Sequence, residues 1–219
     1  MTSGIEWDEK TYPGDDLRND ETAFDVSDHR FRYLFEKEMA NTPGKSFKYN
    51  SALPVVEAAI IHKTTGVQAN IFAEEHLFKP LNITNYYWRT NEKDGYVTAI
   101  GPLFLVPRDM AKLGQLFLDS GQWKGVQVVS KNWVKDATTT FIGNEKSADG
   151  YGYHWWTAVY FLKDMTVRVF FARGSGGQYI FVVPDLNSVV VFTGGNYPPR
   201  NQGAPVDMFV KVIMPAMIE

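Results

Sequence analysis

The sequence predicts an α+β fold in which helices cover an antiparallel β-sheet. Residues 1–150 show mainly helical periodicity, interrupted by turns that contain proline and glycine. Residues 151–195 hold four runs of β-branched and aromatic residues, separated by links of four residues. A further helical stretch follows at 204–217. We therefore expect one domain over residues 1–219, with a helical part at 1–150 and a sheet with a C-terminal helix at 151–219.

The helices are predicted from apolar periodicity and from residues that favour helix ends. Ser27, Ser51 and Ser130 suit N-cap positions, because a serine hydroxyl can accept a hydrogen bond from an exposed backbone N–H. Pro107 suits a first helical position, and Gly66 suits the residue after a helix. The expected helices span residues 27–39, 51–65, 71–78, 107–121, 130–137 and 204–217.

The strands are predicted from the four apolar runs in the second half of the chain. They read YGYHWWTAVYF, TVRVFFAR, QYIFVVP and SVVVFTGG. Links of four residues are too short for parallel crossovers, so the strands should form an antiparallel meander. The runs are apolar almost throughout, which indicates that both faces of the sheet are covered, one by the final helix and the other by the helical first half.

Composition excludes several classes of function. The 22 basic and 25 acidic residues form no basic stripe, so we expect no nucleic-acid partner. The chain has no cysteine, which excludes disulfides and thiolate metal sites, and its four histidines lack metal-ligand spacing. No apolar run approaches the about 20 residues of a membrane span. We expect no metal, no cofactor and no membrane span.

Two stretches carry residues that could do chemistry. The first is Phe47–Ser51, in which Tyr49 is either a half-buried aromatic residue or a general base that depends on nearby cations. The second is Arg173–Gln178, which is either a tight hairpin or a strand whose backbone N–H groups stabilise an oxyanion. The acidic residues Asp8 and Glu9 are expected to be solvated loop charges rather than a catalytic pair.

Four stretches in the same order resemble one enzyme family. They are FKYNSALPVVEAAIIHKTTG, VPRDMAKLGQLFLDSGQWKGVQVVSKNWV, YGYHWW and GSGGQYIFVVPDLNSVVVFTGGN. Together they are similar to the serine β-lactamase-like hydrolases, the group of class C β-lactamases, DD-peptidases, esterases and 6-aminohexanoate-oligomer hydrolases. The resemblance covers nearly the whole chain from Thr2 onward.

The resemblance implies roles for particular residues. Tyr49, Asn50 and Ser51 match the family's Tyr-x-Asn or Tyr-x-Ser motif, so Tyr49 would be the base and proton relay. Ser51 would be a polar partner of the substrate or of the family's lysine. The resemblance also implies an oxyanion and substrate strand that consists of Ser175, Gly176, Gly177 and Gln178. The candidate substrate contacts are Trp7, Asn50, Arg173 and Trp155.

The glycine stretch departs from the family's third motif, which is Lys-Thr-Gly or His-x-Gly. Ser175–Gly177 keeps the final glycine and lacks the cation, and this disfavours β-lactamase activity in particular. The second oxyanion N–H would come from Gln178. Arg173 lies two residues before Ser175, so in an extended strand it would share that face and could replace the cation. Alternatively, Arg173 is a solvated strand residue.

The family's nucleophile motif, Ser-x-x-Lys, is absent: none of the nine serines has a lysine three residues later. In the family this motif lies upstream of the segment that opens this chain. The resemblance therefore implies an incomplete domain with an exposed sheet edge and an exposed apolar surface. Several hundred Å² of lost burial corresponds to on the order of 10 kcal/mol. A separate N-terminal fragment or a second copy of the chain would cover that surface.

Three functional hypotheses follow. The first is a fragment of a serine hydrolase that acts on a small ester, amide or β-lactam through an acyl-enzyme, without its nucleophile. The second is a non-catalytic relative that serves as a binding or structural module. The third is one half of a split hydrolase. The compartment stays open between periplasm and cytoplasm.

Overall fold

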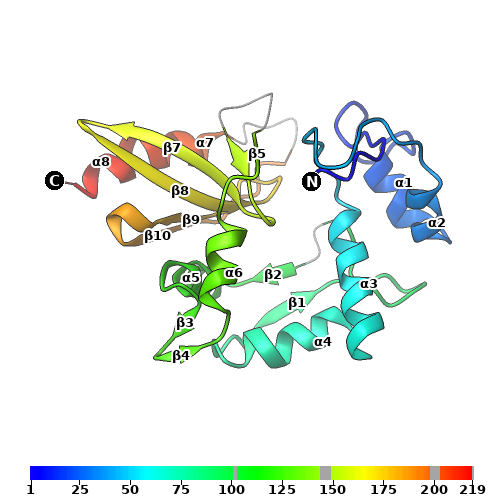
Figure 1. Ribbon diagram of the computed structural model, residues 1–219, viewed down its shortest axis with the longest axis horizontal. Helices are drawn as coiled ribbons and strands as arrows, with labels where there is room; N and C mark the ends of the chain where they lie inside the picture. The colour runs from blue at the N-terminus through cyan, green and yellow to red at the C-terminus, as the bar shows by residue number, and fades with distance from the viewer. Residues whose placement is uncertain (101–102, 144–148, 198–202, 219) are drawn as a thin grey trace. The chain divides into compact units, whose positions relative to one another are not determined.

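The computed structural model describes residues 1–100, 103–143, 149–197 and 203–218. The chain forms two compact units, Met1–Phe104 and Leu105–Glu219, whose elements are labelled in Figure 1. The division that we expected at residue 150 falls inside the second unit. Each unit is described by itself below.

The first unit consists of short helices, connecting loops and a small two-stranded sheet. In chain order its elements are α1 (Asp20–Val26), α2 (Arg30–Phe35), α3 (Leu53–Thr65), α4 (Ala69–Ala73), the π-helical turn η1 (Glu74–Phe78), β1 (Tyr86–Trp88) and β2 (Leu103–Leu105), which pairs with β1.

The core of the first unit joins the N-terminal segment to α1, α2 and the start of α3. Its buried residues are Trp7, Phe24, Leu34, Ala52 and Val55. The Trp7 ring meets the Phe24 ring edge to face, with 6.1 Å between the centroids. Full burial of side chains of this size contributes about 1.5–3 kcal/mol each, so the opening residues of the chain are an integral part of this unit.

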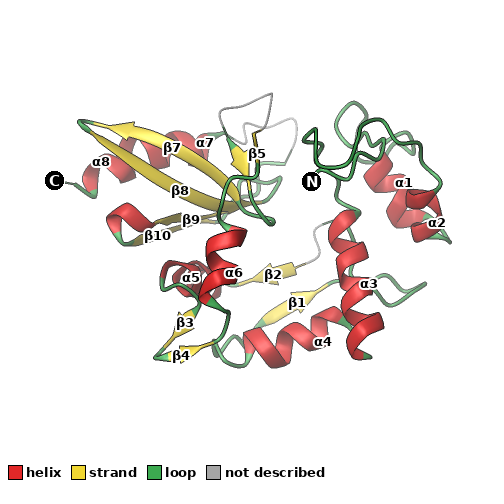
Figure 2. Ribbon diagram, in the orientation of Figure 1, coloured by secondary structure: helices red, strands yellow, loops and turns green. Residues whose placement is uncertain are grey.

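The second unit is built on a six-stranded antiparallel sheet with the order β10-β9-β8-β7-β6-β5 (Figure 2). The long strands confirm the predicted meander. The strands of this unit are β3 (Gln122–Trp123), β4 (Val126–Gln127), β5 (Ile142–Gly143), β6 (Gly150–Tyr151), β7 (Trp156–Leu162), β8 (Met165–Arg173), β9 (Tyr179–Val183) and β10 (Ser188–Phe192). Its helices and helical turns are α5 (Pro107–Leu118), α6 (Lys131–Ala137), η2 (Pro184–Leu186), α7 (Ala204–Met208), η3 (Phe209–Ile213) and α8 (Met214–Ala216).

Helices cover both faces of this sheet. On one face, Phe170, Ile180 and Val182 pack against apolar side chains of α5. Gly114 of α5 permits the close approach, because a Cβ there would lie 2.5 Å from a methyl group of Val189. On the other face, Phe181 stacks on Phe209 of η3, with 4.2 Å between the ring centroids. This layering is the helix-covered antiparallel sheet that the sequence predicts.

Several helix ends agree with the prediction, and one helix does not. Gly66 ends α3 with a φ of +75°, and the Ser130 hydroxyl accepts a hydrogen bond from the Trp133 amide at the start of α6. The prediction of a single helix over residues 27–39 is wrong. Asn19 caps α1, Ser27 lies at the C-terminal end of α1, and α2 covers only Arg30–Phe35.

The sheet presents apolar side chains to solvent at β7. Phe161 is 83% exposed and Val159 is 55% exposed. Strand β10 forms one edge of the sheet among the described residues, and its side chains are half-buried.

Candidate active site

The Tyr49–Ser51 turn lies directly before α3 and is fixed by a buried asparagine. Asn50 is 1% exposed, and its Oδ1 accepts a hydrogen bond from the Ala52 amide at 2.9 Å. The Asn50 Nδ2 atom is buried and has no hydrogen-bond partner among the described residues. Tyr49 is half-buried, and the Lys10 ammonium lies 6.0 Å from the centroid of its ring. Ser51 does not cap α3, whose N-cap residue is Ala52.

One glutamate contacts Ser51. The Ser51 amide donates to Glu9 Oε2 at 2.9 Å, and the same oxygen accepts the Trp7 indole N–H at 2.6 Å. A second glutamate, Glu21, lies in the first turn of α1. Burial, with a smaller contribution from the charge of Glu9, raises the pKa of Glu21 to about 7. Sequence reasoning missed both glutamates, and the interpretation of Glu9 as a solvated loop charge is wrong.

Trp7, predicted as a substrate contact, has its side chain in the core and is only 1% exposed. The N-terminal segment buries this ring by running beside the segment after α2, where Ile5 forms an antiparallel bridge with Met39. The Asn50 side chain, also predicted as a substrate contact, lies inside the first unit.

The glycine stretch forms the hairpin turn between β8 and β9. The Gly174 amide donates to the Gln178 carbonyl oxygen at 2.9 Å, and the Gly177 amide donates to the Gly174 carbonyl oxygen at 3.2 Å. The Gln178 side chain accepts from the Gly176 amide at 3.1 Å and donates to the Gly194 carbonyl oxygen. Three backbone N–H groups of the stretch therefore form hydrogen bonds within the turn. Of the two structures that the sequence allowed, the stretch adopts the tight hairpin.

Backbone conformation and close packing account for the glycines. Gly177 has a φ of +88°, a left-handed conformation that side chains disfavour. A Cβ on Gly194 would lie 2.6 Å from the Gly176 carbonyl oxygen, so these two backbone segments are in direct contact. Ser175 is exposed at the tip of the turn.

Arg173 and Trp155 make packing contacts. The Arg173 guanidinium lies 3.8 Å from the centroid of the Trp156 ring. Strand β8 ends at Arg173, so the expected alternation of faces does not extend to Ser175. Trp155 is half-buried, with its ring 4.6 Å from that of Phe117.

The structure brings the predicted residues together in two sets. The first unit holds Trp7, Tyr49, Asn50 and Ser51. The second unit holds the other predicted residues, which are Trp155, Arg173, Ser175, Gly176, Gly177 and Gln178.

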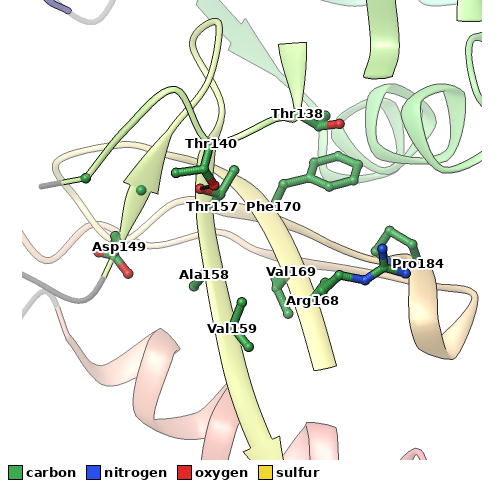
Figure 3. Close-up of a pocket in the computed structure, with 12 residues that line it drawn as sticks. Thr138, Thr140, Asp149, Thr157, Ala158, Val159, Arg168, Val169, Phe170 and Pro184 are labelled. Carbon is green, nitrogen blue, oxygen red and sulfur yellow. Dashed lines mark hydrogen bonds between the residues drawn. The ribbon is translucent and has the colours of Figure 1, made fainter. Parts of the chain in front are cut away.

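A cavity of about 550 Å³ lies in the second unit along β6, β7 and β8 (Figure 3). In it the hydroxyls of Thr140 and Thr157 are 2.7 Å apart, and Asp149 and Arg168 contribute charged groups. The Arg168 guanidinium is paired with Asp185 at 2.5 Å. None of the residues predicted from the sequence lines this cavity.

The described part of the chain contains no group of three or more histidine, aspartate or glutamate side chains arranged to hold a metal ion. None of the helices in that part is both long and apolar enough to span a bilayer.

The chain has a β-lactamase/transpeptidase-like fold, because solved structures of that fold superpose on it. A Bacillus anthracis protein assigned provisionally as a 6-aminohexanoate-dimer hydrolase superposes with a TM-score of 0.80 at 21% identity, over 100% of this chain and 59% of that one. An octameric penicillin-binding protein homologue from Pyrococcus abyssi gives a TM-score of 0.62 at 20% identity, over 86% of this chain and 47% of that one.

Residues 1–208 match the Beta-lactamase family, and the chain belongs to that family. A relative described as 6-aminohexanoate-dimer hydrolase, from Paenarthrobacter ureafaciens, is 25% identical over 154 residues. The match covers 66% of this chain and 38% of that relative. The chain is therefore a β-lactamase-fold hydrolase homologue that spans less than two thirds of the length of each of these proteins.

Proposed function

We propose that this chain supplies the tyrosine-bearing turn and the substrate-side hairpin of a serine hydrolase that cleaves a linear amide or ester through an acyl-enzyme. The observation that carries the proposal is the turn at Tyr49–Ser51. Its backbone is held by Asn50 and Glu9 through hydrogen bonds of 2.9 Å each. A turn fixed in this way can present the Tyr49 hydroxyl in one position, as a catalytic base requires.

In this proposal each residue has one role. Tyr49 takes the proton from the attacking serine and returns it to the leaving group, and the nearby Lys10 ammonium adds positive charge beside the phenol. Ser51 is the polar partner of the substrate. Because three N–H groups of the hairpin are bonded within the turn, the oxyanion donor would be the Gln178 amide. The nucleophilic serine lies outside the 219 residues, since none of them forms Ser-x-x-Lys.

A linear amide or ester is favoured over a β-lactam for two reasons. Ser175 stands where the family's β-lactamases carry a lysine, so the cation of that motif is absent. The relative from Paenarthrobacter ureafaciens is described as a 6-aminohexanoate-dimer hydrolase. The 6-aminohexanoate dimer and a p-nitrophenyl ester are therefore the substrates to test first.

The test uses the DNA sequence upstream of codon 1. We expect it to encode Ser-x-x-Lys and the longer chain to hydrolyse one of these substrates. Tyr49→Phe in that chain should lower kcat/KM at least about 100-fold, because it removes the proton-transferring hydroxyl. Tyr87→Phe is the matched control, since Tyr87 is 61% exposed in the same unit. Equal activity of the two variants would exclude Tyr49 as the base.

One alternative has specific support. The absent Ser-x-x-Lys motif and the internally bonded hairpin both suit a non-catalytic binding module. A stop codon directly upstream, together with no turnover by the 219-residue chain, would favour this alternative over a hydrolase.

A further inference from the structure

The cavity along β6, β7 and β8 carries side chains of opposite charge on its two sides (Figure 3). Asp149 directly precedes β6 and Arg168 lies on β8, so β7 runs between them. Two strand spacings separate their backbones, which corresponds to about 10 Å. The apolar side chains of Val159 and Phe170 also line the cavity. The lining therefore combines a carboxylate, a guanidinium and an apolar surface.

We propose that this cavity binds a small linear amino carboxylate, with the ligand's ammonium group at Asp149 and its carboxylate at Arg168. The cavity volume of about 550 Å³ lies within the range of roughly 300–1,000 Å³ that is usual for small-molecule sites. None of the residues that have a role in the proposed function lines the cavity. The inference therefore goes beyond that function and does not rest on it.

A pair of threonine hydroxyls supports the ammonium end of the site. The hydroxyls of Thr140 and Thr157 are 2.7 Å apart, and Thr157 is only 7% exposed. Gly150, the residue after Asp149, permits this pair, because a Cβ there would lie 2.6 Å from the Thr157 hydroxyl oxygen and still closer to a methyl group of Thr140. An ammonium group has three N–H donors. It can therefore donate to the Asp149 carboxylate and to a threonine oxygen together.

Arg168 retains donors for the carboxylate end although it is ion-paired. Its Nε donates to Asp185 Oδ2 at 3.1 Å, and its Nη2 donates to Asp185 Oδ1 at 2.5 Å. A guanidinium has five N–H donors, so others remain for a ligand carboxylate. The charges of Arg168 and Asp185 offset one another, which leaves the negative charge of Asp149 as the uncompensated charge of this lining. The ammonium should therefore contribute more to binding than the carboxylate.

Nitrogen-15 NMR of the 219-residue chain tests the site, with the backbone amides of Gly150 and Val159 as reporters. The probes are 6-aminohexanoate, hexylamine and hexanoate, which share a methylene chain and differ in their charged ends. We expect 6-aminohexanoate to shift both reporters in a saturable way. Hexylamine should bind more weakly, because it lacks the carboxylate for Arg168, and hexanoate should give no saturable shift.

Two variants test the residues, each with a matched control. Asp149→Asn should weaken the binding of 6-aminohexanoate at least about tenfold, because it removes a charge-assisted hydrogen bond. Asp164→Asn, at an exposed position in the turn between β7 and β8, should leave the affinity unchanged.

The second variant, Gly143→Leu, fills the cavity without touching a charge. Gly143 lies opposite Gly150 in the β5–β6 pair, so its side chain would point to the same face of the sheet as that of Gly150. A Cβ on Gly143 would meet no atom within 4 Å, so the substitution has room. It should abolish binding. Gly195→Leu is the control, because Gly195 has the same free space and does not line the cavity.

Three results would overturn the proposal. They are the absence of a saturable shift with 6-aminohexanoate, an affinity for hexanoate equal to that for 6-aminohexanoate, and binding that survives Gly143→Leu. Equal affinities for hexylamine and 6-aminohexanoate would overturn the assignment of the carboxylate to Arg168. No measurement here depends on turnover, so failure of this site and failure of the proposed hydrolase are distinguishable.

Discussion

Replacement of Arg30 by methionine is expected to lower the free energy of unfolding by about 4 kcal/mol. The Arg30 side chain is buried and donates to both carboxylate oxygens of Asp94, at 2.6 and 2.9 Å. It also donates to Asp25 at 3.3 Å and to the Val97 carbonyl oxygen at 3.2 Å. Removal of one partner from a buried ion pair leaves charges uncompensated, which typically costs about 3–5 kcal/mol.

Arg32→Met is the matched control for this prediction. Arg32 lies on the same helix, its side chain is 70% exposed, and its ion pair with Glu36 is 3.8 Å long. Exposed pairs of this kind contribute about 0–1 kcal/mol. Urea unfolding followed by tryptophan fluorescence measures both variants, and similar midpoints for the two would contradict a stabilising role for the buried ion pairs of Arg30.

Phe181→Ala should have an effect of the same size in the second unit. Phe181 is fully buried and stacks on Phe209 and Tyr179, with centroid distances of 4.2 and 4.8 Å. Truncation of a buried phenylalanine costs about 3–5 kcal/mol through lost transfer energy and the cavity that remains. The expected result is a lower urea midpoint with an unchanged slope.

Phe161→Ala controls for the loss of an aromatic residue from the same sheet. Phe161 is 83% exposed, so its removal should change stability by less than about 0.5 kcal/mol. If Phe161→Ala destabilised the protein as much as Phe181→Ala, then this face of β7 would be covered in solution, and the description of the core would need revision.

The fold was predictable where the signals are local. The four long strands carry β-branched and aromatic runs, and the short links between them permit only antiparallel pairing. The helix over 27–39 was mispredicted because Ser27 has the chemistry of an N-cap at a position that ends α1. The cap that does begin α1 is Asn19, in a polar loop that gives no apolar periodicity before it.

The candidate site was predictable only in part. The Tyr49–Ser51 turn was found from its motif, but Glu9 is 42 residues from Ser51 in the sequence. A hydrogen bond over that separation leaves no local pattern. The burial of Trp7 was not predictable for the same reason, since it depends on the remote partners Phe24 and Leu34. The roles of these residues in catalysis stay predictions.

The central claim is that Tyr49 and Ser51 serve a nucleophile that the 219 residues do not contain, and covalent labelling with a fluorophosphonate serine probe tests it most directly. Intact-mass analysis of the 219-residue chain should show no adduct, whereas the upstream-extended chain should gain one adduct on the serine of Ser-x-x-Lys. An adduct on Ser51, Ser175 or any other serine of the 219-residue chain would contradict the account, because the nucleophile would then lie within it.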